Sequence, residues 1–142
     1  MFFGEFEYTI DEKGRVGIPP RFKKEIRDGV IVLTQGIEPC ITAYPLSEWN
    51  KLATALTSSS VGRSKLRKLN RAIFGTAFRT PMDTKDRVAL PVSLRQNAGI
   101  ENEVVIVGAN TYFELWNKEQ WESEKADSQE QAWQIIESLE RQ

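Results

Sequence analysis

Residues 11–19 read DEKGRVGIP, and 72 positions further along the chain residues 83–91 read DTKDRVALP. Both stretches place an aspartate, a lysine, an arginine, a valine and a proline at the same positions, so one pattern, D-x-K-x-R-V-x-[I/L]-P, occurs twice. Repetition at a fixed spacing is typical of a duplicated structural unit. We interpret the two stretches as the centres of two copies of one unit.

The same offset, without a gap, relates residues on both sides of these centres. Nine of the 44 aligned positions are identical, and conservative pairs such as Lys23 with Arg95 lie between them. Identical pairs outside the two centres are Phe6 with Phe78, Val32 with Val104, Gly36 with Gly108, and Trp49 with Trp121. A match in both register and chemistry indicates duplication rather than chance.

Each copy predicts one succession of elements: a strand, a tight turn, a return strand, a short helix, a β-hairpin and a helix. Alternation of apolar and polar side chains predicts the first two strands at 6–10 and 15–18. Apolar runs predict the hairpins at 30–33 with 41–44 and at 104–107 with 112–116, and we expect Gly36 and Gly108 at the hairpin turns. The expected fold class is therefore mainly β with short helices, that is α+β.

The length of the chain suggests how the copies are arranged. Units of about 45 residues bury too little surface to be stable alone, so the copies should share a core with each other or with neighbouring subunits. The predicted division is repeat 1 at 5–49, a basic amphipathic connecting helix within 50–76, repeat 2 at 77–121 and an acidic helical tail at 122–142.

Composition excludes several classes of protein. The chain has no histidine and one cysteine, Cys40, which excludes an internal disulfide, a Cys/His zinc site and a Ser-His-Asp or Cys-His catalytic centre. We expect no enzymatic activity, no metal, no cofactor and no small-molecule substrate. No apolar run approaches the ~18 residues of a membrane span, and the first residues lack the features of a signal peptide, so we expect no membrane association and a cytoplasmic location.

Charge is unevenly distributed along a chain whose net charge is −1. Residues 118–142 carry three basic and seven acidic side chains, whereas residues 1–117 carry 16 basic and 13 acidic ones. The near-neutral total does not argue against nucleic-acid binding, because clustering on one face matters more than the sum.

The turn at the centre of each copy has candidates for fixing its shape. Asp11 and Asp83 occupy the first position, where a carboxylate can accept hydrogen bonds from backbone N–H groups two residues on. Gly14 can supply the positive φ that such a turn needs, and Asp86 replaces it in the second copy.

The basic residues of the turns are the candidates for DNA contact: Lys13, Arg15, Lys85 and Arg87. If the neighbouring valines are buried, the arginines must point outward from the strand. Arginine suits bidentate contact with guanine edges or phosphates, and a β-ribbon fits the major groove. The alternative is that each arginine only forms a surface salt bridge with its aspartate, worth at most about 1 kcal/mol.

The connecting helix allows two interpretations. Leu66, Leu69 and Ile73 form an apolar stripe, while Arg63, Arg67 and Arg71 lie on one line along the helix. The basic line is either a solvated face or a surface that pairs with acidic residues of a neighbouring unit or subunit. We expect three tryptophans, Trp49, Trp116 and Trp121, in the core rather than stacked on bases.

The motif at 11–19 resembles the SpoVT/AbrB-like DNA-binding unit. Its duplication, with LRKLNRAIF at 66–74 and FELW at 113–116, resembles the MraZ family over residues 1 to about 121. The resemblance implies a double-split, swapped-hairpin-like β-barrel, a ring-shaped homo-oligomer and a bacterial transcription regulator that acts on promoter repeats upstream of its own division and cell-wall gene cluster. It also implies that the Asp-x-x-x-Arg pairs are Asp11 with Arg15 and Asp83 with Arg87, the first being the better candidate for DNA contact.

The leading hypothesis is a nucleoid-associated, sequence-specific regulator that binds double-stranded DNA through Lys13 and Arg15 and combines several weak turns in an oligomer. The alternative is an oligomeric protein-interaction scaffold or antitoxin-like partner, in which the turns serve assembly.

Overall fold

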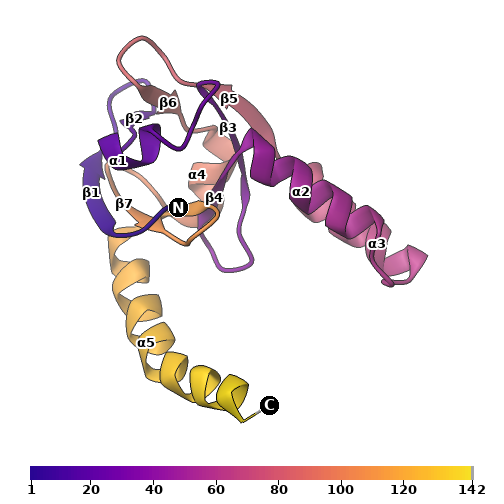
Figure 1. Ribbon diagram of the computed structural model, residues 1–142. Helices are drawn as coiled ribbons and strands as arrows, with labels where there is room; N and C mark the ends of the chain where they lie inside the picture. The colour runs from indigo at the N-terminus through magenta and orange to yellow at the C-terminus, as the bar shows by residue number, and fades with distance from the viewer. Residues whose placement is uncertain (142) are drawn as a thin grey trace.

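The computed structural model of the chain describes residues 1–141. The first half contains β1 (Glu5–Thr9), β2 (Arg15–Gly17), α1 (Pro20–Lys23), β3 (Val30–Gln35), β4 (Ile41–Pro45) and α2 (Leu46–Thr57). Next come α3 (Arg63–Leu69) and a π-helical turn, η1 (Asn70–Phe74). The second half contains β5 (Phe78–Pro81), β6 (Arg87–Ala89), α4 (Val92–Ala98), β7 (Glu103–Gly108), β8 (Phe113–Trp116) and α5 (Lys118–Glu140). Both halves have the predicted order of elements (Figure 1).

Strands of the two copies alternate in the sheets. The main sheet has the order β1-β7-β8-β4-β3-β5, and β2 pairs with β6 in a separate two-stranded ribbon. The hairpins β3–β4 and β7–β8 form within a copy, and every other pairing joins one copy to the other. The two copies are therefore joined by exchange of strands rather than packed as separate sheets.

The prediction that the second strand of each copy returns alongside the first is therefore wrong. β1 pairs with β7, and β2 pairs with β6. On the ribbon Val16 lies opposite Val88, and both side chains are about 1% exposed. Because β2 pairs with a strand of the other copy, both valines lie in one hydrophobic core that the two copies share.

The fold class of strands with short helices is confirmed, although one helix, α5, is long. The six-stranded sheet is not closed into a barrel: over residues 1–141, β1 and β5 are its two edges and are not hydrogen-bonded to each other. The β2–β6 ribbon continues from these edge strands and covers the core.

The core draws on both copies. Phe22 of the first copy and Phe113 of the second have ring centroids 5.1 Å apart, and Phe2 lies 5.1 and 5.2 Å from these two rings. Aromatic pairs at this spacing add to the free energy gained by burying their area. The two units thus share one hydrophobic cluster, as their small size predicts.

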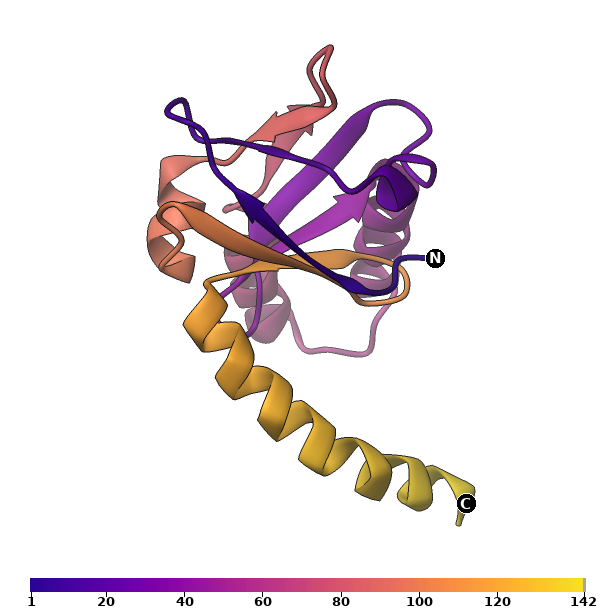
Figure 2. The same ribbon diagram turned by 90° about the vertical axis from the view of Figure 1, so that its left-hand side faces the viewer.

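Two helical parts project from this body in different directions (Figures 1 and 2). The α2–α3 hairpin is attached through Trp49, whose ring lies 4.8 Å from that of Phe74, and through Thr34, which donates a hydrogen bond to the Ile73 carbonyl at 2.7 Å. The base of α5 is held by Trp121 against the buried Trp116, with ring centroids 5.7 Å apart.

Among the described residues no helix is long and apolar enough to cross a membrane.

The glycines at the hairpin ends serve a steric need. Gly36 and Gly108 lie where expected, at the ends of β3 and β7, but neither has a positive φ. A Cβ at Gly108 would collide with the backbone of Phe2 and Phe3, because the first residues of the chain pair with Asn110 beside it. Asn110, with φ of 74°, takes the left-handed conformation in this hairpin.

We expect Gly108→Ala to lower the free energy of unfolding by about 1–3 kcal/mol, because the added methyl group forces the N-terminal segment off the hairpin. Urea denaturation followed by tryptophan fluorescence measures this loss. The control is Gly17→Ala, where a Cβ meets only Tyr8 at 3.6 Å and the repeat counterpart is already Ala89. Equal stability of the Gly108→Ala variant and the unchanged chain would contradict the steric role.

Candidate nucleic-acid interface

The first turn is fixed by one carboxylate. Asp11 Oδ1 accepts hydrogen bonds from the backbone N–H groups of Lys13 and Arg15, each at 2.9 Å, and its Oδ2 accepts one from Arg15 Nε at 2.8 Å. Gly14 closes the turn with φ of 76° and donates its N–H to the Asp11 carbonyl at 3.0 Å. One side chain therefore holds both the backbone of the turn and the guanidinium group.

The second turn repeats these contacts. Asp83 Oδ1 accepts from the N–H groups of Lys85 and Arg87 at 2.9 Å, and Oδ2 accepts from Arg87 Nε at 2.9 Å. Asp86 has φ of 58°, so an aspartate here adopts the left-handed conformation that Gly14 adopts in the first turn. The loss of glycine in the second copy leaves the shape of the turn unchanged.

Both turn aspartates are stabilised as carboxylates. The backbone hydrogen bond from Arg15 lowers the pKa of Asp11 below its ordinary value, helped by the Arg15 side chain and the Lys13 N–H. The backbone hydrogen bond from Arg87 lowers the pKa of Asp83 in the same way. At neutral pH each arginine therefore faces an ionised partner.

The exchanged ribbon brings the two turns to one end of the molecule. β2 and β6 run antiparallel, the Gly14 carbonyl accepts from Leu90 N at 2.8 Å, and the Asp86 carbonyl accepts from Ile18 N at 3.1 Å. The two turns therefore flank opposite ends of a ribbon only three residues long, each next to the end of the other copy's strand. Both turns lie at the end of the molecule opposite α5 (Figures 1 and 2).

The helix of each copy places a basic side chain against the turn of the other copy. Lys23 Nζ, at the end of α1, lies 2.6 Å from Asp86 Oδ2. Its repeat counterpart Arg95 covers Gly14 and donates from Nε to the Leu90 carbonyl at 3.1 Å. The negative charge of Asp86 is consequently offset by Lys23, and the two turns differ less in charge than the sequence alone suggests.

The two arginines differ in their surroundings. Asp11 Oδ2 lies 3.7 Å from Arg87 Nη1 as well as 2.8 Å from Arg15 Nε, so Arg87 is shared between both aspartates. Within residues 1–141, Arg15 has an ion pair with Asp11 alone, made through Nε. Over residues 1–141 its terminal nitrogens take part in no ion pair, and its side chain is 30% exposed.

All the candidate residues of the two turns therefore lie at one end. Lys13 and Lys85 are exposed, and over residues 1–141 neither side chain takes part in an ion pair. Strand alternation suggests that the two arginines project freely from the ribbon. In the structure each arginine is instead held by the aspartate of its own turn. Sequence reasoning missed the roles of Lys23 and Arg95, although their shared register in the repeat was a usable signal.

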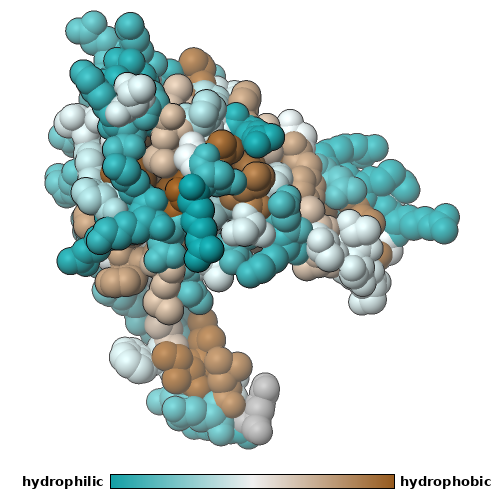
Figure 3. All heavy atoms as spheres, turned by 45° about the horizontal axis from the view of Figure 1, so that its top comes forward, coloured by the Kyte–Doolittle hydropathy of each residue, from teal (hydrophilic) through white to brown (hydrophobic). Residues whose placement is uncertain are grey.

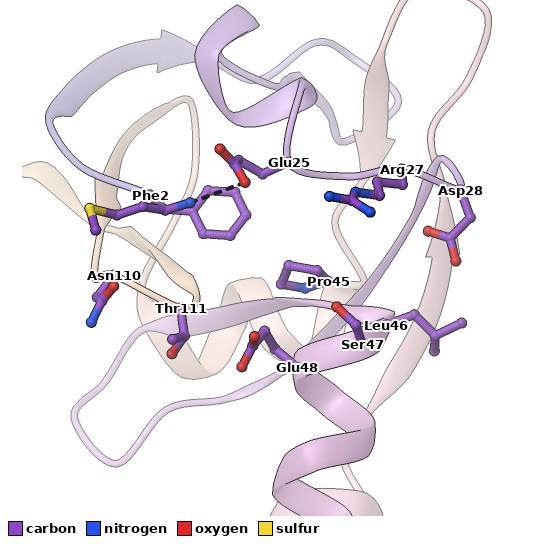
Figure 4. A pocket seen from close by; sticks show the side chains of 11 residues that line it. Phe2, Glu25, Arg27, Asp28, Pro45, Leu46, Ser47, Glu48, Asn110 and Thr111 are labelled. Atoms are coloured by element: carbon purple, nitrogen blue, oxygen red, sulfur yellow. Dashed lines mark ion pairs between the residues drawn. The ribbon is translucent and has the colours of Figure 1, made fainter.

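A hollow elsewhere on the surface is separate from the turns. It measures about 510 Å³ and is lined by residues such as Glu25, Arg27, Glu48 and Asn110, with the Met1 amino group 3.0 Å from Glu25 (Figure 4). None of the turn residues lines it.

Among the described residues, no group of three or more His, Cys, Asp or Glu side chains is arranged to hold a metal ion.

The exchanged strands and the two Asp–Arg turns on one ribbon define a class of protein built from two tandem β-repeats. The chain belongs to the MraZ family. The family model described as "MraZ protein, putative antitoxin-like" matches residues 1–71 and 73–138.

Individual relatives support this assignment. A protein of Dehalococcoides mccartyi named "Transcriptional regulator MraZ" is 54% identical over 140 residues, 99% of each chain. A protein with the same name from Thermomicrobium roseum is 41% identical over 121 residues, which cover 85% of this chain and 84% of the relative. One from Acetivibrio thermocellus is 37% identical over 139 residues, which cover 98% of this chain and 96% of the relative. The family model reaches residue 138, so the likeness includes most of the acidic tail, beyond the limit near residue 121 that the motifs suggest.

We expect the turns to contribute a stabilisation that is lost in acid. The pKa values of Asp11 and Asp83 are lower in the folded chain than the ordinary value of about 3.9, so the stabilisation is complete above that value and disappears as the pH falls through the folded-state pKa values. The urea midpoint, measured from pH 2 to 7, should decline less steeply below about pH 4 in the double variant Asp11→Asn, Asp83→Asn than in the unchanged chain. An identical pH dependence of both proteins would contradict this.

Proposed function

We propose that the protein is a sequence-specific regulator that binds double-stranded DNA through the paired turns of the β2–β6 ribbon, with Lys13 and Arg15 as the principal contacts. The observation that carries the proposal is the Asp11 carboxylate, which holds Arg15 through Nε at 2.8 Å, while over residues 1–141 the terminal nitrogens of the guanidinium form no ion pair. A guanidinium held in this way loses less conformational entropy when it binds.

The chemistry of the turns suits DNA. The terminal nitrogens of an arginine can donate to O6 and N7 of guanine, and a two-stranded ribbon has the dimensions to enter a major groove. The exposed Lys13 and Lys85 suit phosphate contacts, which position a protein on the duplex and make its affinity depend on salt.

The first copy is the better candidate for base contact. Arg87 lies near two aspartates, and Asp86 adds a carboxylate beside it, whereas Arg15 lies beside Gly14 and pairs with Asp11 alone. We assign Asp83 and Arg87 mainly to holding the second turn, with Lys85 as a supporting phosphate contact.

We infer the remaining parts of the function from family membership. The protein would act in the cytoplasm, associated with the nucleoid, on tandem promoter repeats upstream of its own division and cell-wall gene cluster, and as a ring-shaped homo-oligomer. Several weak turns bound at once raise the affinity for repeated sites without any stronger single contact. The division at 5–49, 50–76, 77–121 and 122–142 remains our proposal for the organisation of the chain.

The antitoxin-like description of the family model favours a second candidate, a scaffold that binds protein. On that view the Asp–Arg turns would serve assembly, and removal of Arg15 would disrupt the oligomer. The exposure of both turn lysines favours an anionic ligand instead.

We expect Arg15→Ala to lower the affinity for a fragment of its own promoter at least tenfold, because each bidentate contact contributes about 1–3 kcal/mol and recurs in every subunit. Gel shift and fluorescence anisotropy over a series of salt concentrations measure this loss, and sedimentation checks that the assembly is intact.

Arg87→Ala is the matched control, since it removes the same group from the second turn and should weaken binding less. Lys13→Ala should weaken binding to all sequences alike and reduce the slope of log K against log salt by about one. Unchanged DNA binding by Arg15→Ala would exclude the proposed contact, and loss of the oligomer would favour the scaffold.

A further inference from the structure

The α2–α3 hairpin has an apolar seam that the rest of the chain leaves half open. No residue of α2, α3 or η1 is buried, and four leucines along the two helices are only partly covered: Leu52, Leu56, Leu66 and Leu69. The hairpin projects from the sheet, so its outer part touches little else (Figure 1). A two-helix hairpin with a half-covered seam can accommodate a third helix.

The α3–η1 arm of the hairpin is basic, whereas the start of α2 carries Glu48, paired with Lys51. Residues 49–82 contain seven lysines and arginines and no aspartate or glutamate. Five of the seven lie on α3 and η1: Arg63, Lys65, Arg67, Lys68 and Arg71. Any partner that covers the seam must therefore bring negative charge.

The far half of α5 has the complementary character. Its apolar side chains are exposed, Trp133 at 71%, Leu139 at 64%, Ile135 at 58% and Ile136 at 42%. At about 100° per residue they fall within half of the helix circumference. Figure 3 shows this apolar surface, in brown, on the outer part of α5. Residues 126–140 carry four acidic side chains and no basic one.

The two surfaces do not meet within one chain. The hairpin and α5 diverge from the body, and over residues 1–141 no ion pair joins α3 to α5 (Figures 1 and 2). The near half of α5 is fixed to β1 by Lys118, 3.5 Å from Glu7, and by Lys125, 3.1 Å from Glu5. These contacts aim the far half of the helix away from its own hairpin.

We propose that residues 126–140 of α5 dock on the α2–α3 hairpin of a second copy of this chain. The leucine seam of the hairpin and the exposed apolar side chains of α5 would cover each other. The acidic residues that flank Trp133, such as Glu130 and Glu137, would face the arginines of α3. This inference deepens the oligomer of the proposed function and rests on it.

Charge also decides the symmetry of the contact. A two-fold pairing of α5 with α5 would bring acid against acid, and a pairing of two hairpins would bring base against base. Only the contact of tail with hairpin neutralises both surfaces, so the interface joins two different patches. Such a head-to-tail contact generates a ring when the rotation between subunits closes. Neither patch includes a residue of the DNA-contacting turns, which stay open.

The test uses two charge-reversal variants. One reverses the hairpin, Arg67→Glu with Arg71→Glu, and the other reverses the tail, Glu130→Arg with Glu137→Arg; all four side chains are exposed. Sedimentation without DNA should show the unchanged chain as a multimer and each variant alone as a monomer of about 16.2 kDa.

The decisive measurement is the equimolar mixture of the two variants, in which the side chains at positions 67 and 71 of one copy can always face side chains of opposite charge at positions 130 and 137 of the next. We expect the mixture to recover the mass of the original assembly, which also shows that each variant is folded. The control Lys24→Glu reverses an exposed charge on the loop after α1 and should leave the mass unchanged.

Three results would overturn the proposal: a monomeric unchanged chain, multimers formed by either variant alone, or a mixture that stays monomeric. A hairpin variant that keeps its mass but loses DNA affinity would instead identify the basic helix as a DNA surface. Because these masses are measured without DNA, failure here is distinguishable from failure of the Arg15 contact.

Discussion

The pairing of β2 with β6 is the interaction on which the rest of the structure depends. Val16 and Val88 face each other on this ribbon and are buried together, so the two copies are joined at their centres rather than docked side by side. The same ribbon fixes where each turn lies, because each turn accepts a backbone hydrogen bond from the strand of the other copy. The position of both turns and the integrity of the core therefore depend on one contact.

Local features of this fold follow from the sequence. The alternation around Phe6, the prolines that end the second strands and the carboxylate at the head of each turn predict the elements and the turn geometry. Strand partners cannot be predicted in this way, because alternation is identical whether β2 pairs with β1 or with β6. The ion pair of Arg15 with Asp11, by contrast, was one of the two alternatives that the sequence left open, and the structure shows that it forms.

The divergence of the two turns illustrates how a duplicated unit can specialise while its shape is kept. Asp86 adopts the same left-handed backbone as Gly14, so the fold tolerates the exchange. Its added charge is met by Lys23 at 2.6 Å, whereas the counterpart Arg95 lies over a glycine and donates to a carbonyl instead. One substitution thus changes the electrostatics of a turn, and a basic residue from the other copy limits the change.

The exchange of strands also has a kinetic consequence. β1 pairs with β7 and β2 with β6, so strands near the start of the chain find their partners only after most of it has been synthesised. Contacts between distant segments slow folding, because the loop must close before the pairing stabilises it. During translation the β3–β4 hairpin would form first and present two unpaired edges until β5 and β8 arrive. The nascent chain thus exposes unpaired strand edges until its second half has left the ribosome.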